Sequence, residues 1–549
     1  MTTGKQIRDS LLNKGFFPEV LPPCFVSTNL ARSFNGLIKE ILPKEYFKRS
    51  SAYVRYNGTK HDGNRRYYGA VNPIPYFYLC NFIGSKWNDF ETKFQKSAFS
   101  ISNIRLGEKQ DDRAILVSSL SEVASNLSSQ IKYSPFLLKT DIAQFFPSIY
   151  THSIVWAAHG RDQAKSDIDK KSEVIYFNKL DLFIQQCQNG QTRGVIVGPD
   201  AFRIVAEFLV SNIDGILEDS AKELIIGGVR HVDDYYLGIK SEFDSSIVLS
   251  QLRDILQTYE LQVNDSKTKV LPGLYPVDDI WAQELRFNSR YNSLDDYMNF
   301  LLDKAFDISN NLGSQSPMKL ALRRLDKYEL YNRITWSEFE PKLQRILFHF
   351  PHCLDYLCLL LAKRVAIGKS IDRVGWKNII EIIIEKSVGA AHHHEIVWLL
   401  WVSFVCKIDL SEELIETLCK TNNSFVKSIL IAAHKEGLCD NISIRLGSNL
   451  SSDDETWLQN IVARSTGYSR ARFSGSYAAE FEKLIEKGVK FIDFKKHMRL
   501  MADEHKEAIS KSKYGYDADE EDEEDENNDS PFVDALYRTL FEDEDESPF

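Results

Sequence analysis

Residues 228–239 read GVRHVDDYYLGI and place two adjacent acids, Asp233 and Asp234, between apolar and aromatic runs. This pattern predicts a β-hairpin with the two acids at its turn. Neighbouring carboxylates in an apolar hairpin are costly, because both are partly buried and each disfavours the charge of the other. A divalent cation would relieve that cost, so the hairpin is a candidate metal site. The alternative is an ordinary solvent-facing turn.

A second acid ends an apolar run in residues 137–149, LLKTDIAQFFPSI, where Asp141 follows strand-like sequence. One Asp from a strand and an Asp pair from a hairpin can together hold two Mg²⁺ ions about 3.5–4 Å apart. Such a pair of ions stabilises the attacking and leaving oxygens of an in-line phosphoryl transfer. The two motifs together therefore indicate nucleotidyl transfer.

The sequence around these motifs alternates between two kinds of segment. Strand-like segments cover residues 135–142, 192–198 and 223–240, and a long helical segment covers residues 199–219. This alternation predicts an α+β or α/β domain.

Four segments, in order, resemble the palm motifs of reverse transcriptases. They are LLKTDIAQFFPSIYTHSI (137–154), RGVIVGPDAFRIVAEFLVSNID (193–214), RHVDDYYLGI (230–239) and LQVNDSKTKV (261–270). The resemblance is closest to bacterial defence-associated reverse transcriptases, the abortive-infection group that protects against phage. KGFFPEVLPPCF (14–25) and HHHEIVWLLW (392–401) are also similar to segments of that group.

This resemblance implies an α+β right-hand polymerase, with fingers and palm, that acts as an RNA-directed DNA polymerase. It implies Mg²⁺ or Mn²⁺ as cofactor, dNTPs as substrates, an RNA template or non-coding RNA, a DNA product and a homo-oligomer. One alternative is an untemplated, protein-primed DNA polymerase. A different class of function is an RNA-binding scaffold or phage sensor in which catalysis is secondary.

The resemblance also assigns roles to individual residues. The catalytic and metal-binding acids are Asp141, Asp233 and Asp234, with Ile142 as a further metal ligand. The resemblance adds Phe146, Arg193, Gly194 and Lys267 as dNTP-binding residues. An aromatic residue at Phe146 would exclude a ribose 2′-hydroxyl and so favour deoxynucleotides. Two positions depart from the family pattern: His231 replaces an aromatic residue near the primer, and Arg193 replaces a frequent Gln.

Independently of this resemblance, the basic run 57–76, with Lys60, Arg65 and Arg66, predicts a mobile ribbon that binds a triphosphate through Arg65 or Arg66, with Arg113 as a further candidate. A solvated loop is the alternative for this run.

Five regions follow from the changes in sequence character. They are an N-terminal helical extension (1–50), fingers and palm (51–280), a thumb-like helical connector (281–330), an all-α and repeat-like C-terminal domain (331–511) and an acidic tail (512–549). Residues 335–338, 409–412 and 452–455 each match a capping box that would open a helix. Three successive histidines, 392–394, point in different directions on a helix and indicate a polar junction or an oligomer contact.

The formal net charge is −11, but residues 517–549 contain 16 acids and one base, which leaves +4 for the rest of the chain. By composition this acidic tail is disordered. Its end, EDEDESPF, resembles the tip of bacterial single-stranded-DNA-binding proteins, so the tail is predicted either to contact partners of those proteins or to fold back on the basic nucleic-acid channel of this chain. A solubilising tail is the alternative.

The eight cysteines are scattered, without zinc-site spacing, which is typical of a reduced cytoplasm. No apolar run reaches the ~20 residues that cross a bilayer, so a cytoplasmic protein without membrane contact is expected.

Overall fold

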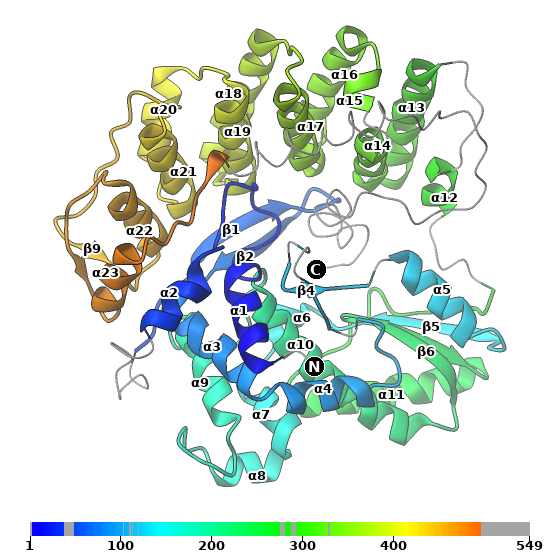
Figure 1. The fold of residues 1–549 in the computed structure, drawn as a ribbon. Helices are drawn as coiled ribbons and strands as arrows, with labels where there is room; N and C mark the ends of the chain where they lie inside the picture. The colour runs from blue at the N-terminus through cyan, green and yellow to red at the C-terminus, as the bar shows by residue number, and fades with distance from the viewer. Residues whose placement is uncertain are drawn as a thin grey trace, which may run out of the picture.

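The computed structural model describes residues 3–37, 49–102, 104–108, 111, 113–118, 120–274, 280–286, 293–327 and 330–495. It contains a four-stranded sheet with helices on both faces, a separate hairpin and a curved row of helices (Figure 1). The predicted acidic tail, residues 512–549, lies outside the described residues, so its disorder and its contacts remain predictions.

The four-stranded antiparallel sheet consists of β5 (Phe136–Asp141), β6 (Ile225–His231), β7 (Asp234–Ile239) and β8 (Lys269–Pro272), in the order β6-β7-β5-β8. Strands β6 and β7 form the hairpin predicted from residues 228–239. The strand predicted at 192–198 is wrong, because only Arg193 forms an isolated bridge there. Gly194 and Gly198 have φ values of +83° and +129°, and such angles interrupt an extended strand.

Helices cover both faces of this sheet, and the strand alternation decides which side chains meet them. Leu137 and Val229 form a small core with α5 (Leu120–Gln130). Leu138 and Tyr235 join the main core, to which α10 (Asp200–Ala221) and α11 (Glu242–Thr258) contribute. The sheet is therefore held rigidly between two apolar layers.

A separate hairpin pairs β1 (Val54–Thr59) with β2 (Arg65–Ala70), with Thr59 opposite Arg65. Between this hairpin and α10 the chain also forms α3 (Pro73–Ser85), α4 (Trp87–Lys96), β3 (Arg105–Leu106), β4 (Ile115–Leu116), α6 (Phe145–Ser148), α7 (Thr151–His159), α8 (Arg161–Ser166) and α9 (Asn178–Cys187).

From residue 280 onward the regular elements of the described chain are α-helices, apart from a 3₁₀ turn (Pro351–Cys353) and the short strands β9 (Leu450–Ser451) and β10 (Phe473–Ser474). Its helices are α12 (Ile280–Arg286), α13 (Leu294–Leu312), α14 (Ser316–Lys327), α15 (Leu330–Arg333), α16 (Trp336–His349), α17 (Leu354–Ala366), α18 (Arg373–Ala390), α19 (His393–Cys406), α20 (Glu412–Cys419), α21 (Ser424–Lys435), α22 (Trp457–Thr466) and α23 (Ala478–Glu486). Figure 1 shows α13 to α23 in a curved row around the β1–β2 hairpin, and we call this row (residues 294–486) the helical arc.

Only one of the three predicted capping boxes marks a helix start. Thr335 is the N-cap of α16, although its side chain makes no capping hydrogen bond. The other two are wrong, because α20 begins after Ser411 and α22 begins after Thr456. The observed N-caps lie two and four residues after the predicted ones, and the Ser452 hydroxyl instead accepts a 3.1 Å hydrogen bond from the Tyr477 N–H.

The N-terminal region, with α1 (Gly4–Asn13) and α2 (Leu30–Leu37), packs against the arc and the segment that follows it. The ring of Phe16 stacks on Phe491 with centroids 5.6 Å apart, and Phe25 forms a bridge with Ile492. The indole of Trp398 donates a 2.9 Å hydrogen bond to the Val20 carbonyl. The first and last described segments therefore share one apolar core.

Among the described residues, no single helix combines the length and apolar composition of a membrane span; Trp336–His349 and Pro351–Ala366 meet both criteria only as a pair bent by 115°. All eight cysteines are free thiols.

Candidate active site

The three predicted acids meet at one end of the sheet. Asp141 and Asp234 are direct partners across β5 and β7, and Asp233 precedes Asp234 at the hairpin turn. Their exposed fractions are only 3% for Asp141, 3% for Asp233 and 6% for Asp234. The sheet thus concentrates three carboxylates in a position that water reaches poorly.

Backbone hydrogen bonds hold the turn that carries Asp233. Val232 has a φ of +54°, a conformation that costs free energy for a β-branched residue. Its N–H donates to Ser102 Oγ at 2.8 Å, and its carbonyl accepts from Arg230 Nη1 at 2.6 Å. The Ile142 N–H donates to the Asp233 carbonyl at 3.3 Å, which ties the turn to the end of β5.

Arg230 lies fully buried behind the turn, between two carboxylates of α10. Its Nε donates to both oxygens of Asp214, at 3.0 and 2.8 Å, and its Nη2 donates to Glu207 Oε1 at 2.7 Å. Burial alone would lower the pKa of Arg230, but the charges of Asp214 and Glu207 outweigh it and the pKa is raised. The Tyr235 hydroxyl also donates to Asp214, at 2.8 Å. This network fixes the hairpin to α10.

Lys267 supplies a cation directly at the site. Its Nζ lies 2.8 Å from Asp141 Oδ2, although 43% of its side chain is exposed. The preceding turn is anchored because the Asn264 N–H donates to the Asp141 carbonyl at 2.9 Å. The Thr268 and Thr140 hydroxyls share a 2.7 Å hydrogen bond. The predicted late lysine therefore does reach the aspartates.

Burial makes the charged forms of these acids unfavourable. Burial, followed by the charges of Asp234 and Asp141, raises the pKa of Asp233 well above its usual value. Burial is also the largest cause for Asp234, whose pKa rises to about 7 although the cations of Lys267 and Lys139 lower it. The site is thus short of positive charge.

Two carboxylate oxygens, Asp141 Oδ1 and Asp233 Oδ1, are buried without a hydrogen-bond partner. Carboxylate oxygens are the ligands that Mg²⁺ and Mn²⁺ prefer, so these residues fit such a metal. In the part of the chain that the structure describes, no three His, Cys, Asp or Glu side chains could hold a metal by themselves. Water or phosphate oxygens would have to complete the shell, as is usual for Mg²⁺. The predicted contribution of Ile142 remains a prediction.

The structure separates the roles of Arg65 and Arg66. Arg65 is turned toward the helical arc, where its guanidinium forms an ion pair with Glu395 at 2.6 Å. Successive residues of a strand point to opposite faces, so Arg66 lies on the other side of the hairpin. Burial, followed by the charge of Arg66, lowers the pKa of Lys60. The charge of Lys267 also lowers this pKa, whereas the charge of Asp233 raises it. Lys60 is therefore the hairpin cation on which the charge of Asp233 acts, whereas Arg65 is held by the helical arc.

Arg113 does not face this site. It is buried, and its guanidinium forms an ion pair with Asp200. It also donates to the Phe17 carbonyl at 2.9 Å and to the Gly198 carbonyl at 3.4 Å. These internal partners make Arg113 a residue that holds the N-terminal segment to α10, and we remove it from the nucleotide site.

Phe146 and the glycine loop are hydrogen-bonded together. The Gly194 N–H donates to the Ile149 carbonyl at 2.8 Å, and the Val195 N–H donates to the Phe146 carbonyl at 2.9 Å. Phe146 is buried in α6, whereas Arg193, the neighbour of Gly194 in the glycine loop, is exposed. The structure thus brings the motif of residues 137–154 against the motif of residues 193–214. The nucleotide contacts of Phe146, Arg193 and Gly194 remain predictions.

The Gly194→Ala variant is expected to lose roughly 1–2 kcal/mol of stability, the cost of left-handed backbone for a residue with a Cβ. At a φ of +83°, the added Cβ would also lie 3.2 Å from the Pro147 carbonyl oxygen. Denaturant unfolding would measure the loss. As a control, Gly215→Ala, inside α10 with nothing within 4 Å, should gain up to ~1 kcal/mol. Equal midpoints for the two variants would contradict this reading of the loop.

His231 is buried beside the acids and pairs with Asp234 across the hairpin. Its Nε2 donates to the Ser118 carbonyl at 3.2 Å, since a carbonyl oxygen can only accept. This contact fixes the orientation of the ring, and a primer contact remains a prediction.

Three contributing residues were absent from the sequence interpretation: Glu207, Asp214 and Arg230. Their only sequence signal is that Glu207 and Asp214 are acids at i and i+7 on the apolar face of α10. Such buried acids require a cation, and Arg230 lies one residue before His231 of the hairpin motif.

No protein-family model matches this sequence, and no curated protein does. Among solved structures, apo telomerase from Candida tropicalis is similar, with a TM-score of 0.30 and 12% identity, over 69% of this chain and 70% of that chain. Telomerase from Candida albicans in complex with a fragment of telomeric RNA gives 0.27 and 12%, over 72% of this chain and 65% of that chain. Likeness at this level does not establish a shared activity.

Proposed function

We propose that this chain is a reverse-transcriptase-like nucleotidyltransferase that adds dNTPs to a 3′-hydroxyl, copying RNA into DNA. In this proposal β5 to β8 form the palm and the β1–β2 hairpin belongs to the fingers. The observation that carries the proposal is the pairing of Asp141 with Asp234 beside Asp233, with two buried carboxylate oxygens lacking any partner.

In the proposed mechanism each group of residues has a distinct role. Asp141, Asp233 and Asp234 would hold Mg²⁺ or Mn²⁺, and such ions stabilise the attacking and leaving oxygens of phosphoryl transfer. Lys60 and Arg66 supply positive charge for the triphosphate. The 3′-hydroxyl gives its proton to water, its oxygen forms a bond to the α-phosphorus, and the bond between the α-phosphorus and the pyrophosphate oxygen breaks. Lys267 donates a proton to the departing pyrophosphate.

The Lys267→Met variant is expected to incorporate dNTPs about 10²-fold more slowly, because a general acid contributes 10²–10⁴-fold. Lys267→Arg should retain most of the charge but transfer the proton poorly. Lys240→Met changes an exposed lysine at the end of β7 and serves as the control. Single-turnover incorporation rates would measure the effect. Equal rates for Lys267→Met and Lys240→Met would remove Lys267 from the mechanism.

One assay tests the proposed function and separates it from its alternatives. The purified protein is incubated with Mg²⁺ and each labelled dNTP, and the products are treated with protease, RNase or DNase. Label that remains on the protein indicates protein priming, and incorporation of a single nucleotide indicates untemplated synthesis. A complete lack of incorporation, also with co-purified RNA, would favour an RNA-binding scaffold.

The family resemblance further leads us to propose a role in anti-phage defence, as a homo-oligomer in the bacterial cytoplasm. Phage plaque counts on cells that express the wild-type chain or the Asp233→Asn variant would test the defence role. Light scattering of the purified protein would test the oligomer. Protection by both chains alike would separate defence from catalysis.

A further inference from the structure

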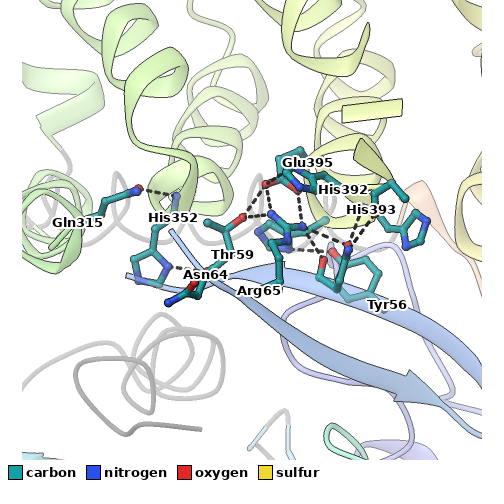
Figure 2. Close-up of polar contacts among 12 residues, drawn as sticks. Tyr56, Thr59, Asn64, Arg65, Gln315, His352, His392, His393 and Glu395 are labelled. Carbon is teal, nitrogen blue, oxygen red and sulfur yellow. Dashed lines mark hydrogen bonds and ion pairs between the residues drawn. The ribbon is translucent and has the colours of Figure 1, made fainter. Parts of the chain in front are cut away.

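The β1–β2 hairpin is attached to the helical arc by a buried ion pair. Arg65 Nη1 and Nη2 donate to the two carboxylate oxygens of Glu395 at 2.6 and 2.9 Å, a bidentate arrangement (Figure 2). The Thr59 hydroxyl donates to the same carboxylate at 2.6 Å. Only 4% of the Glu395 side chain and 17% of the Arg65 side chain are exposed. Bidentate, water-excluded pairs of this kind fix geometry strongly.

The base of the hairpin binds the beginning of α19 in several further places. The Asn57 amide donates to the Ala391 carbonyl at 2.9 Å, and its Oδ1 accepts from the His393 N–H at 2.8 Å. The Tyr56 hydroxyl and His394 Nδ1 share a 2.9 Å hydrogen bond. The predicted polar junction at the three histidines is therefore a contact within this chain.

The tip of the hairpin binds a second part of the arc. His352 Nδ1 donates to the Thr59 carbonyl at 2.9 Å (Figure 2). The Gln315 N–H donates to the His61 carbonyl at 2.8 Å, and His61 Nδ1 is 3.2 Å from Ser314 Oγ. Two separate regions of the arc thus form hydrogen bonds with two different parts of one short hairpin.

The hairpin also contacts the loop of Gly194 beside the proposed active site, because the Gly69 N–H donates to the Val197 carbonyl at 3.0 Å. Arg65 points to the arc, so Arg66, the next residue of β2, lies on the other face of the hairpin. Lys60 lies close enough to Asp233 and Lys267 for their charges to act on it. A shift of the hairpin would therefore move these cations relative to the aspartates.

We infer that Glu395 is a positioning residue for nucleotide binding: through Arg65 it holds the β1–β2 hairpin, and so Lys60 and Arg66, over the aspartates. This inference rests on the proposed function. The helical arc then sets the affinity for the triphosphate without touching it. A displacement near 1 Å is enough to cost 10²-fold in such sites.

The test compares Glu395→Gln with Asp326→Asn. The Gln keeps the shape of the side chain but removes the charge that pairs with Arg65. The control breaks the buried 2.8 Å ion pair between Asp326 and Lys363, whose two ends both lie inside the arc. We expect both variants to have a lower Tm. Only Glu395→Gln should raise the KM for dNTP, by at least ~10-fold with kcat within ~3-fold, since ground-state binding is what is lost.

A double variant separates positioning from stability. Adding Arg65→Gln to Glu395→Gln removes the unpaired cation, so Tm should recover while KM stays high. Recovery of KM together with Tm, or an equal rise of KM in Asp326→Asn, would overturn the inference.

Hydrogen exchange at Val54–Ala70 tests the attachment without catalysis. Faster exchange in Glu395→Gln than in Asp326→Asn supports the attachment, and equal exchange overturns it. If the wild-type chain incorporates nothing while exchange differs, the proposed function fails and the attachment stands.

Discussion

The Asp233→Asn variant is expected to incorporate dNTPs at least ~10³-fold more slowly than the wild-type chain, because metal binding supplies several kcal/mol of transition-state stabilisation. The side chain keeps its shape but loses the charge beside Asp234 and Asp141. The same variant should have a higher Tm without metal. Burial raises the pKa of Asp233, so its ionisation destabilises the fold as pH rises above the usual aspartate range. Asparagine removes that penalty at neutral pH.

Incorporation of labelled dNTP and thermal unfolding, each with and without Mg²⁺, would measure both effects. Mg²⁺ should raise the Tm of the wild-type chain more than that of the variant. Asp265→Asn is the matched control, because this acid is 74% exposed and pairs only with the exposed Arg253 among its described ion pairs. Near-normal incorporation by Asp233→Asn would remove the aspartates from catalysis.

The Arg230→Met variant is expected to lose about 3–5 kcal/mol of stability, the usual cost of removing one partner from a buried charge network. Asp214 and Glu207 would remain buried without their cation, and the Val232 carbonyl would lose its 2.6 Å donor. We expect activity to fall as well, because the turn that carries Asp233 is released.

Denaturant unfolding of two further variants makes this prediction specific. Combining Arg230→Met with Asp214→Asn and Glu207→Gln removes all the charges and should recover part of the stability. Arg253→Ala breaks an ion pair that is 49% and 74% exposed, so it should cost less than ~1 kcal/mol. Similar losses for Arg230→Met and Arg253→Ala would contradict the role of the buried network.

The parts that sequence could predict are those with a local pattern. The adjacent acids within alternating apolar residues predicted the β6–β7 hairpin, and the apolar run before Asp141 predicted β5. Lys267 was predicted from the resemblance of residues 261–270 to a family motif, and the Asn264 N–H, which donates to the Asp141 carbonyl, brings this segment to Asp141.

The parts that sequence could not predict depend on distant partners. Arg65 and Arg66 are neighbours of the same type, and only the docking of α19 decides which one faces the arc. By sequence, Arg113 was an equally suitable candidate for binding the triphosphate, but in the structure it pairs with Asp200 at the start of α10. The sequence shows which residues are cationic, but it does not show whether a cation is paired within the protein or available to a ligand.

The contact between Phe25 and Ile492 has a consequence for how the chain is made. A ribosome adds ~5–20 residues per second, so synthesis of all 549 residues takes roughly 25–110 s. For most of that time the N-terminal segment exists without the residues that complete its core. A product cut short before the last helices would leave Phe16 and Phe25 uncovered, which favours its removal by chaperones and proteases. The core around Phe16 and Phe25 is therefore completed only after residues 491 and 492 have been synthesised.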